Sequence, residues 1–304
     1  MSWQLAVLRR SLKRTAYPVM GRVRNWGIAR TAFRLSAKLA FRSVRGTRYV
    51  QAEGALAPGL FVRGRAEPKP GVILYLHGGA YIIGSPGTYW ELAGRIARQT
   101  GHRVYLPDYP LAPEDPAPAA FHAAVLAWEA LLGDGLRPDQ IVIAGDSAGG
   151  GLALALLAHA LAEGQRPAGV VAFSPWTDLT LSGNSLKTNA DTDVLLPAAR
   201  VHEIRDLVVG ALAPDDPRVS PLFARFPNCP PAFIAWSETE ILRDDAVRMA
   251  RKLRDGGAFV EQDVQADAPH VWQLFHGMVP EANASLHKAA RFIVAALARR
   301  EAGS

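Results

Sequence analysis

The segment 145–149, which reads Gly-Asp-Ser-Ala-Gly, constrains the fold of this chain more than any other stretch. It follows residues 140–144, an apolar β-branched run typical of a buried strand, and precedes residues 150–158, which are rich in strong helix formers. A serine between glycines at a strand-to-helix turn is typical of a nucleophile elbow, whose tight backbone suits residues with little side chain. The pattern predicts that Ser147 stands at a helix N-terminus, where N–H groups and the helix dipole favour negative charge. A helix N-cap serine, with glycines for close packing, is the alternative interpretation.

Strand and helix patterns alternate over most of the chain. Apolar strands are predicted at 71–77, 102–107, 140–144, 169–173, 231–236 and 258–264. Helices are predicted at 91–100, 117–132, 150–158, 244–255 and 282–299. An antiparallel hairpin of residues 48–51 and 60–63 is predicted at one edge of the sheet. The alternation indicates the α/β class, with a mostly parallel central sheet and helices on both of its faces.

The N-terminal region is basic and contains no acidic residue before Glu53, although the whole chain has a net charge of only +6. It predicts two basic amphipathic helices, separated by Pro18 and Gly21 or Gly27. Their apolar stripes are supplied by Leu5, Leu8, Leu12, Phe33, Leu35, Leu39 and Phe41. This region allows three interpretations: a helical cap over the site, a membrane-surface helix pair or an Arg-rich targeting segment. We favour the cap, because the edge hairpin begins directly after it and a mere tether would leave the apolar residues in water.

These features suggest a division of the 304 residues into two parts. We expect an N-terminal basic helical cap over residues 1–46 and a catalytic α/β domain over residues 47–304. A long insertion at about 179–218 interrupts the alternation of strands and helices. It is a second candidate for cap material.

Several other classes of protein are disfavoured by what the sequence lacks. The single cysteine, Cys229, excludes an internal disulfide and a cysteine-based metal cluster, and favours a reducing, cytoplasmic location. No apolar run reaches the roughly 18 residues of a membrane span, and no secretory hydrophobic region follows the start methionine. No His, Asp or Glu cluster has metal-ligand spacing, and neither a phosphate-binding loop nor a dinucleotide fingerprint is present. We therefore expect no metal, no cofactor and no nucleic-acid partner.

A second glycine-containing motif, HGGAY at 77–81, follows the predicted strand 71–77. Acyl transfer needs a nucleophile, a base, an orienting acid and oxyanion donors. Adjacent glycines let the backbone approach a substrate with its N–H groups exposed, although an ordinary tight turn is the alternative. We predict that the N–H groups of Gly78, Gly79 and Ala148 form an oxyanion hole.

Together these motifs resemble the hormone-sensitive-lipase-like family of α/β-hydrolases, the bacterial family IV esterases. The resemblance covers roughly residues 71–275. It rests on HGGA at 77–80, DYPLAPE at 108–114, GDSAGG at 145–150, SPWTDL at 174–179 and RVSPL at 218–222. Two positions depart from the family pattern: Ala80 stands where a third glycine is frequent, and Pro110 stands where arginine is common. Because alanine keeps its N–H group, we expect Ala80 to change the pocket shape slightly without loss of activity.

The resemblance also implies the remaining catalytic residues. His270, in the segment APHVW at 268–272, lies at the family's position for the base. The family pattern acid-x-Leu-x-Asp places the acid at Glu240, where a glutamate can hold the imidazole as an aspartate does. The competing candidates are His276 and His287 for the base, and Glu238 and Asp244 for the acid, with Asp244 and Asp245 better suited to the first turn of the next helix.

The resemblance therefore implies a carboxylic ester hydrolase that acts on short- to medium-chain acyl esters through an acyl-enzyme on Ser147. Its partner would be a small-molecule ester, with Tyr81 and Trp90 as candidates for the pocket walls. A membrane-surface lipase or amide deacylase is the alternative, because the fold alone does not determine the function. A non-catalytic binding module is disfavoured, because such relatives lose the histidine that this chain keeps at His270. Peripheral membrane contact through the N-terminal helices and a homodimer stay open.

Overall fold

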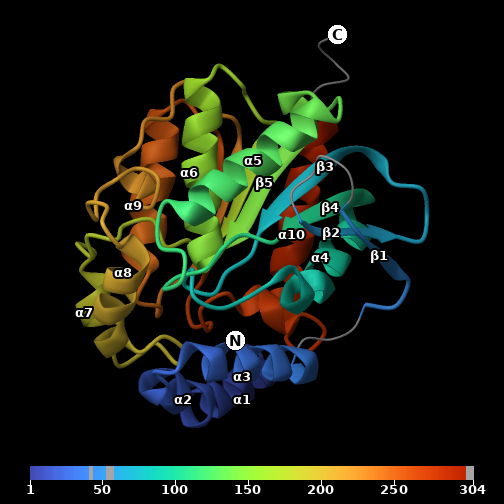
Figure 1. Ribbon diagram of the computed structural model, residues 1–304. Coiled ribbons are helices and arrows are strands. Elements are labelled where there is room, and N and C mark those ends of the chain that lie inside the picture. The colour runs from blue at the N-terminus through green and yellow to red at the C-terminus, as the bar shows by residue number, and fades with distance from the viewer. Residues whose placement is uncertain (41–43, 53–57, 299–304) are drawn as a thin grey trace.

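The computed structural model describes residues 1–40, 44–52 and 58–298. Its centre is an eight-stranded sheet in the order β1-β2-β4-β3-β5-β6-β7-β8 (Figure 1). The strands are β1 (Thr47–Gln51), β2 (Gly59–Gly64), β3 (Lys69–Leu76), β4 (His102–Pro107), β5 (Ile141–Asp146), β6 (Gly169–Phe173), β7 (Ala232–Ser237) and β8 (Val260–Gln265). The β1–β2 and β2–β4 pairs are antiparallel and the other neighbouring pairs are parallel. The predicted α/β class, mostly parallel sheet and edge hairpin are confirmed.

Helices cover both faces of the sheet, because side chains alternate between its faces along each strand. On β3, Val72 and Leu74 belong to one buried core, whereas Ile73 and Tyr75 belong to the other. The first core is covered by α5 (Ala119–Gly133), α6 (Ser147–Ala162) and α9 (Arg243–Asp255). The second is covered by α4 (Pro86–Thr100) and α10 (Pro280–Ala298). Short 3-10 turns lie at η1 (Pro138–Gln140) and η4 (Trp272–Phe275).

The N-terminal region forms three helices, so the prediction of two was wrong. They are α1 (Trp3–Arg14), α2 (Ala16–Arg22) and α3 (Trp26–Ala40). Pro18 has no N–H group to donate to the carbonyl of Arg14, and its ring would clash with that carbonyl, so a continuous helix ends there. Pro18 and Gly21 consequently lie inside the short α2, and Gly27 lies in the first turn of α3.

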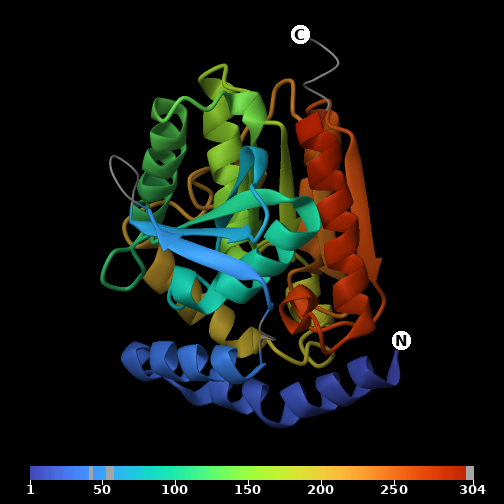
Figure 2. The same cartoon turned by 90° about the vertical axis from the view of Figure 1, so that its right-hand side faces the viewer.

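These three helices lie as a layer across one end of the sheet, as two perpendicular views show (Figures 1 and 2). Of the predicted apolar stripe, the side chains of Leu5, Leu8, Leu12 and Phe33 pack against the core. Leu35, which was expected in the same stripe, is instead 55% exposed. The side chain of Leu39, and Phe41 as a whole, fall outside the described residues. The helical cap is therefore confirmed, but only part of its predicted apolar stripe faces the core.

The segment between β6 and β7 supplies further helices next to this layer. They are α7 (Ser185–Thr188), η2 (Ala198–Arg200), α8 (Val201–Val209) and η3 (Pro221–Phe223). Arg200, only 4% exposed, donates hydrogen bonds to the carbonyls of Met20 and Val23 and pairs with Glu203. The N-terminal helices thus contact this segment through a buried guanidinium. Within the described ranges, no helix has the length and apolarity that a membrane span requires.

Candidate active site

Ser147 stands at a tight turn between β5 and α6. The strand ends at Asp146 and the helix begins at the next residue. Ser147 has a φ of +52°, a left-handed conformation that residues with a side chain adopt rarely. A Cβ atom on Gly149 would lie only 2.2 Å from the carbonyl oxygens of Leu76 and His77, so only glycine lets the helix pass there. The turn leaves Ser147 partly buried at the N-terminus of a long helix.

A hydrogen-bonded row connects the three residues predicted as nucleophile, base and acid. Ser147 Oγ lies 2.9 Å from His270 Nε2, and His270 Nδ1 lies 2.6 Å from Glu240 Oε2. The other oxygen of Glu240 accepts the N–H of Ser237 at 2.9 Å, which orients the carboxylate. His270 and Glu240 are 4% and 1% exposed, so water competes little for these hydrogen bonds. The structure therefore brings together the groups that acyl transfer requires.

The competing candidates lie elsewhere or are engaged by other groups. Glu238 pairs with Arg243 at 2.6 Å, and Asp244 accepts a backbone N–H from α7. His276 is buried, and burial together with a nearby positive charge lowers its pKa to about 4. His287 is exposed on α10. Among the histidines of the described residues, only His270 is hydrogen-bonded to the hydroxyl of Ser147.

The pKa of His270 results from opposing effects. Burial alone would lower this pKa, because it removes the imidazolium from water. The hydrogen bond that His270 donates to Glu240, and the negative charge of Glu240, act in the other direction, assisted by the charges of Asp193 and Asp146. The outcome is a pKa raised above the usual value of 6.5. His270 is thus a stronger base toward the hydroxyl proton of Ser147, and its protonated form is stabilised.

The loop after β3 offers a different set of N–H groups from the predicted set. Gly78 already donates its N–H to Asp146 Oδ1 at 3.0 Å, so this donor is occupied. Among the described residues, the N–H groups of Gly79 and Ala80 have no acceptor. Ala80 has a φ of +55°, a left-handed conformation that accounts for glycine being frequent at this position. The prediction for Gly78 is therefore corrected: the free donors at this end of the sheet belong to Gly79, Ala80 and the first turn of α6, which contains Ala148.

Asp146 holds this loop against the sheet. Its carboxylate is 1% exposed and accepts hydrogen bonds from the hydroxyls of Tyr75 and Tyr89, each at 2.9 Å, besides the N–H of Gly78. Burial raises the pKa of Asp146 to about 6, although the two tyrosine hydroxyls act to lower it. One carboxylate therefore connects β3, α4 and β5 directly beneath the catalytic row. The sequence shows Asp146 next to the serine but gives no sign of this role.

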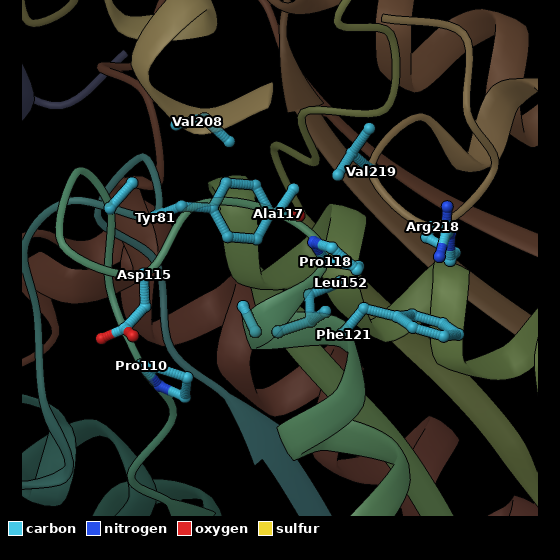
Figure 3. Close-up of a pocket in the computed structure, with 12 residues that line it drawn as sticks. Tyr81, Pro110, Asp115, Ala117, Pro118, Phe121, Leu152, Val208, Arg218 and Val219 are labelled. Atoms are coloured by element: carbon cyan, nitrogen blue, oxygen red, sulfur yellow. The ribbon is translucent and has the colours of Figure 1, made fainter. Parts of the chain in front are cut away.

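The two predicted wall residues lie on opposite faces of the sheet. Tyr81 is 4% exposed and borders a small cavity of about 10 Å³ (Figure 3). Its neighbours there include Ala117, Phe121, Leu152, Val208 and Val219. The Tyr81 hydroxyl has no hydrogen-bond partner among the described residues. Trp90 is partly buried against the second core and packs edge-on against the exposed Tyr49, with ring centroids 4.4 Å apart, and it does not line that cavity.

Two carboxylates that the sequence analysis did not assign to the site also lie close to it. Asp193, 2% exposed, accepts the N–H of Ile241 at 3.0 Å, directly after the residue Glu240. Asp245 lies in the first turn of α9 as expected, but its buried carboxylate accepts the N–H groups of Thr177 and Asp178. Burial raises the pKa of Asp245 to about 7. Both groups fix loops at the carboxyl end of the sheet, a role that depends on contacts between distant parts of the chain. No group of three or more His, Cys, Asp or Glu residues in the described part of the chain could hold a metal ion.

Comparison with known proteins agrees with the acyl-transfer chemistry that the site geometry indicates. Residues 73–274 match the family described as the alpha/beta hydrolase fold. An esterase of Acinetobacter venetianus is 36% identical over 223 residues, which cover 73% of this chain and 74% of the relative. The solved structure of EstE5, soaked with p-nitrophenyl butyrate, has a TM-score of 0.91 and 32% identity, and covers 98% of this chain and 100% of its own. The solved structure of an esterase of the bacterial hormone-sensitive lipase family has a TM-score of 0.91 and 31% identity. The match covers 98% of this chain and 99% of that esterase.

The chain therefore belongs to the α/β-hydrolase family, in its bacterial hormone-sensitive-lipase branch. It is a carboxylesterase of the serine-hydrolase class. The family and activity implied by the sequence motifs are confirmed by these matches.

Proposed function

We propose that this esterase works through an acyl-enzyme, with Ser147 as nucleophile, His270 as general base and Glu240 as the orienting acid. The observation that carries the proposal is the hydrogen-bonded row from Ser147 Oγ through His270 to Glu240, at 2.9 and 2.6 Å. Each atom stands at the distance over which a proton can be passed or held.

In the first half of the reaction, His270 Nε2 takes the proton of Ser147 as Oγ attacks the ester carbonyl. The resulting oxyanion accepts hydrogen bonds from backbone N–H groups. His270 then returns the proton to the leaving alcohol, and the acyl group stays on Ser147. In the second half, water gives a proton to His270 and attacks the acyl carbon. His270 then returns this proton to Ser147 Oγ as the acyl–oxygen bond breaks and the carboxylic acid departs. Glu240 stays ionised throughout, holding Nδ1–H and stabilising the imidazolium.

The oxyanion donors in this mechanism are the N–H groups of Gly79, Ala80 and Ala148. This set differs from the predicted one in using Ala80 in place of Gly78, whose N–H is held by Asp146. Alanine at position 80 supplies the same N–H as glycine would, so the departure from the family pattern does not remove a donor. Its methyl group occupies space at the edge of the site instead.

We propose short- to medium-chain acyl esters as the substrate class. The cavity beside Tyr81 is small, about 10 Å³, so any acyl chain that enters it would displace the surrounding side chains, and a longer chain would displace more of them. The similar protein EstE5 was soaked with p-nitrophenyl butyrate, an ester of this class. A panel of p-nitrophenyl acetate, butyrate, octanoate and palmitate tests the proposal. Faster turnover of emulsified long-chain triglyceride than of the soluble butyrate ester would contradict it and favour the lipase alternative.

The division into a cap over residues 1–46 and a catalytic domain over 47–304, with cap insertion at about 179–218, is also a proposal. It is supported by the contacts of Arg200 with the N-terminal helices.

The mechanism itself needs only an ester and water. Peripheral membrane contact, a homodimer and amide deacylation are additional proposals that it does not require. A cytoplasmic location rests on the single, buried Cys229, whose pKa burial raises to about 12.

Trapping the acyl-enzyme tests the mechanism directly. A fast-reacting p-nitrophenyl ester mixed with stoichiometric enzyme should add one acyl mass to the protein, on the peptide that contains Ser147. Ser11→Ala, which changes an exposed serine in α1, is the control and should be acylated normally. Acylation at any residue other than Ser147 would refute the assignment.

A further inference from the structure

The layer formed by α1, α2 and α3 has an outer side that the catalytic body does not cover. Large apolar side chains on these helices are each at least 50% exposed. They are Trp3, Val7, Val19, Ile28 and Leu35. The residues that pack inward, such as Leu5 and Phe33, belong to the same helices. The cap is thus apolar on both sides, although only the inner side has a partner in the described structure.

Helical spacing separates the two sides cleanly on α1. Trp3, Val7, Arg10 and Arg14 follow one another at intervals of four, three and four residues, so they share one face of the helix, and all four are exposed. Leu5, which is 1% exposed, lies on the opposite face. Tryptophan and arginine side chains are both favoured at membrane–water interfaces, because each combines an apolar part with a polar tip.

The basic residues of the cap also form two sets, one that contacts the body and one that is exposed. Arg9 pairs with Asp267 at 2.5 Å, Arg30 pairs with Glu114 at 2.6 Å, and Lys13 donates to the carbonyls of Asp191 and Asp193. These three side chains hold the cap on the body. A second set of arginines is exposed and makes no ion pair or side-chain hydrogen bond with any described residue. This set consists of Arg10, Arg14, Arg22 and Arg34.

We propose that this outer cap face docks on an anionic lipid bilayer. The outer cap face consists of Trp3, Val7, Val19, Ile28 and Leu35 together with Arg10, Arg14, Arg22 and Arg34. Its apolar side chains enter the boundary between headgroups and acyl chains, and its arginines meet the lipid phosphates. No acidic residue precedes Glu53, so the cap helices themselves contribute no negative charge to this face.

Charge and apolar exposure together favour a bilayer over other occupants. A second copy of the chain, packed face to face by two-fold symmetry, would bring the same unpaired arginines against one another. A nucleic acid would neutralise the arginines but would offer its polar backbone to the exposed tryptophan and aliphatic side chains. An anionic bilayer is the surface that satisfies both groups.

Docking in this way would orient the active site. The inner side of the cap contacts the loops that follow β3, β4, β7 and β8, through Arg30 to Ile82 and Ala112 and through Arg9 to Thr239 and Asp267. The carboxyl end of the sheet, where Ser147 lies, therefore sits directly behind the cap (Figure 2). Given the proposed esterase function, the bound enzyme would take esters that partition into the lipid phase.

Vesicle co-sedimentation of the full chain tests the proposal. Vesicles of phosphatidylcholine alone are compared with vesicles that also contain phosphatidylglycerol, at low and at high salt. We expect binding to the anionic vesicles only, weakening as salt rises. Binding that is equal on both vesicles, or absent from both, would overturn the proposal.

Matched variants locate the surface. Arg10→Gln with Arg14→Gln should weaken partitioning onto the anionic vesicles by about tenfold or more. Arg251→Gln with Arg254→Gln removes the same charge from exposed positions of α9 and should leave partitioning within about twofold. Trp3→Ser should also weaken it, whereas Leu126→Ser, which alters a side chain 60% exposed on α5, should not. Equal losses in the paired variants would mean that net charge or general hydrophobicity, and not this face, is responsible.

Two further readouts separate this proposal from its alternatives. Turnover of soluble p-nitrophenyl butyrate by the Arg10/Arg14 variant should equal that of the wild type, so a docking failure is distinct from a failure of the esterase. Sedimentation velocity without lipid should give the same oligomeric state for wild type and Trp3→Ser. If Trp3→Ser instead dissociates an oligomer and leaves vesicle binding unchanged, the face is a protein interface and the proposal is wrong.

Discussion

The carboxyl end of the sheet and the cap that covers it are held by different kinds of interaction. Around the nucleophile, buried groups hydrogen-bond to one another, as when Asp146 accepts from three donors and Glu240 holds His270. Across the cap, the contacts include ion pairs that water reaches: the Arg9–Asp267 pair has side chains 17% and 37% exposed. Hydrogen bonds in a buried network are worth more than exposed ion pairs. The catalytic groups thus lie in a buried, hydrogen-bonded region, which we call the rigid region, whereas part of the attachment of the cap depends on weaker, water-exposed ion pairs.

The sharpest test of the rigid region is Ser147→Ala. It should lower ester turnover by about a millionfold, as loss of a nucleophile does when the triad acts as a unit. Thermal unfolding should change little, because the hydroxyl is replaced by a smaller group at a partly buried position. A purified variant that retained more than about a hundredth of wild-type turnover would require a different nucleophile.

Glu240→Gln should have the next largest effect, at about a thousandfold or more in turnover, because an amide holds the imidazole in the wrong tautomer. Glu238→Gln is the matched control two residues away, and should cost little activity, since Glu238 pairs with Arg243. Asp244→Asn should likewise keep activity and lose about 1 kcal/mol of stability or less. If Asp244→Asn or Glu238→Gln proved more damaging than Glu240→Gln, the acid would have to be reassigned.

The difference between local sequence patterns and contacts through space explains what the sequence could predict. Ser147 and His270 could be predicted as partners because their positions follow from a strand-turn-helix pattern and a family motif, and the structure places them in hydrogen-bond contact. Gly78 was misassigned as an oxyanion donor because the carboxylate that occupies its N–H, Asp146, lies 68 residues away in the chain. Trp90 was misplaced because closeness in sequence to the oxyanion loop does not show which face of α4 it occupies. Both errors concern contacts through space, which local patterns do not encode.

In the cap, the break at Arg14 follows from Pro18, but the exposure of Leu35 does not follow from helical spacing alone. An amphipathic pattern predicts that one face is apolar, and it does not say whether that face meets protein or solvent. The cap has apolar side chains on both sides, so the sequence supported a cap and a membrane-surface helix as rival interpretations. In the structure, one side of the helix layer packs on the body, and the outer cap face is the side for which we propose the membrane contact.

Removing the cap probes the weaker region. A chain that begins at Arg48 loses Leu5, Leu8, Leu12 and Phe33 from the second core. Since a buried side chain of this size contributes about 1.5–3 kcal/mol, we expect a lower unfolding temperature or poor solubility. Where the truncated chain stays folded, its acyl-chain preference should shift, measured as kcat/KM across p-nitrophenyl esters. Unchanged stability together with an unchanged preference would show that the cap neither packs on the body nor limits access.

The pH dependence tests the electrostatics of the rigid region. Because the pKa of His270 is raised above 6.5, the midpoint of the acid limb of the kcat/KM profile should lie above pH 6.5. Activity should be lost as the pH drops through this midpoint. Stability behaves in the opposite way: the contribution of His270 is fully present below its unfolded pKa and is lost as the pH rises through the folded value. In Glu240→Gln the acid limb should move to lower pH, because the charge that raises the pKa is gone. An acid limb that stayed in place would mean that Glu240 does not set the pKa of His270.

The smallest expected effect distinguishes two neighbouring arginines on α1. Arg9 faces inward, where it pairs with Asp267 and donates to Thr239, while Arg10 is exposed and makes no ion pair or side-chain hydrogen bond with a described residue. Arg9→Gln should cost about 0.2–1 kcal/mol of unfolding free energy, the usual range for a partly exposed ion pair. Because Thr239 precedes Glu240, and Asp267 lies in the loop that carries His270, kcat/KM should also fall slightly, and high salt should reduce the difference from wild type. Arg10→Gln should change neither quantity in the absence of lipid. If Arg10→Gln destabilised the protein as much as Arg9→Gln does, the inner and outer faces of the cap would not be distinct, and the contrast between a docked side and a free side would fail.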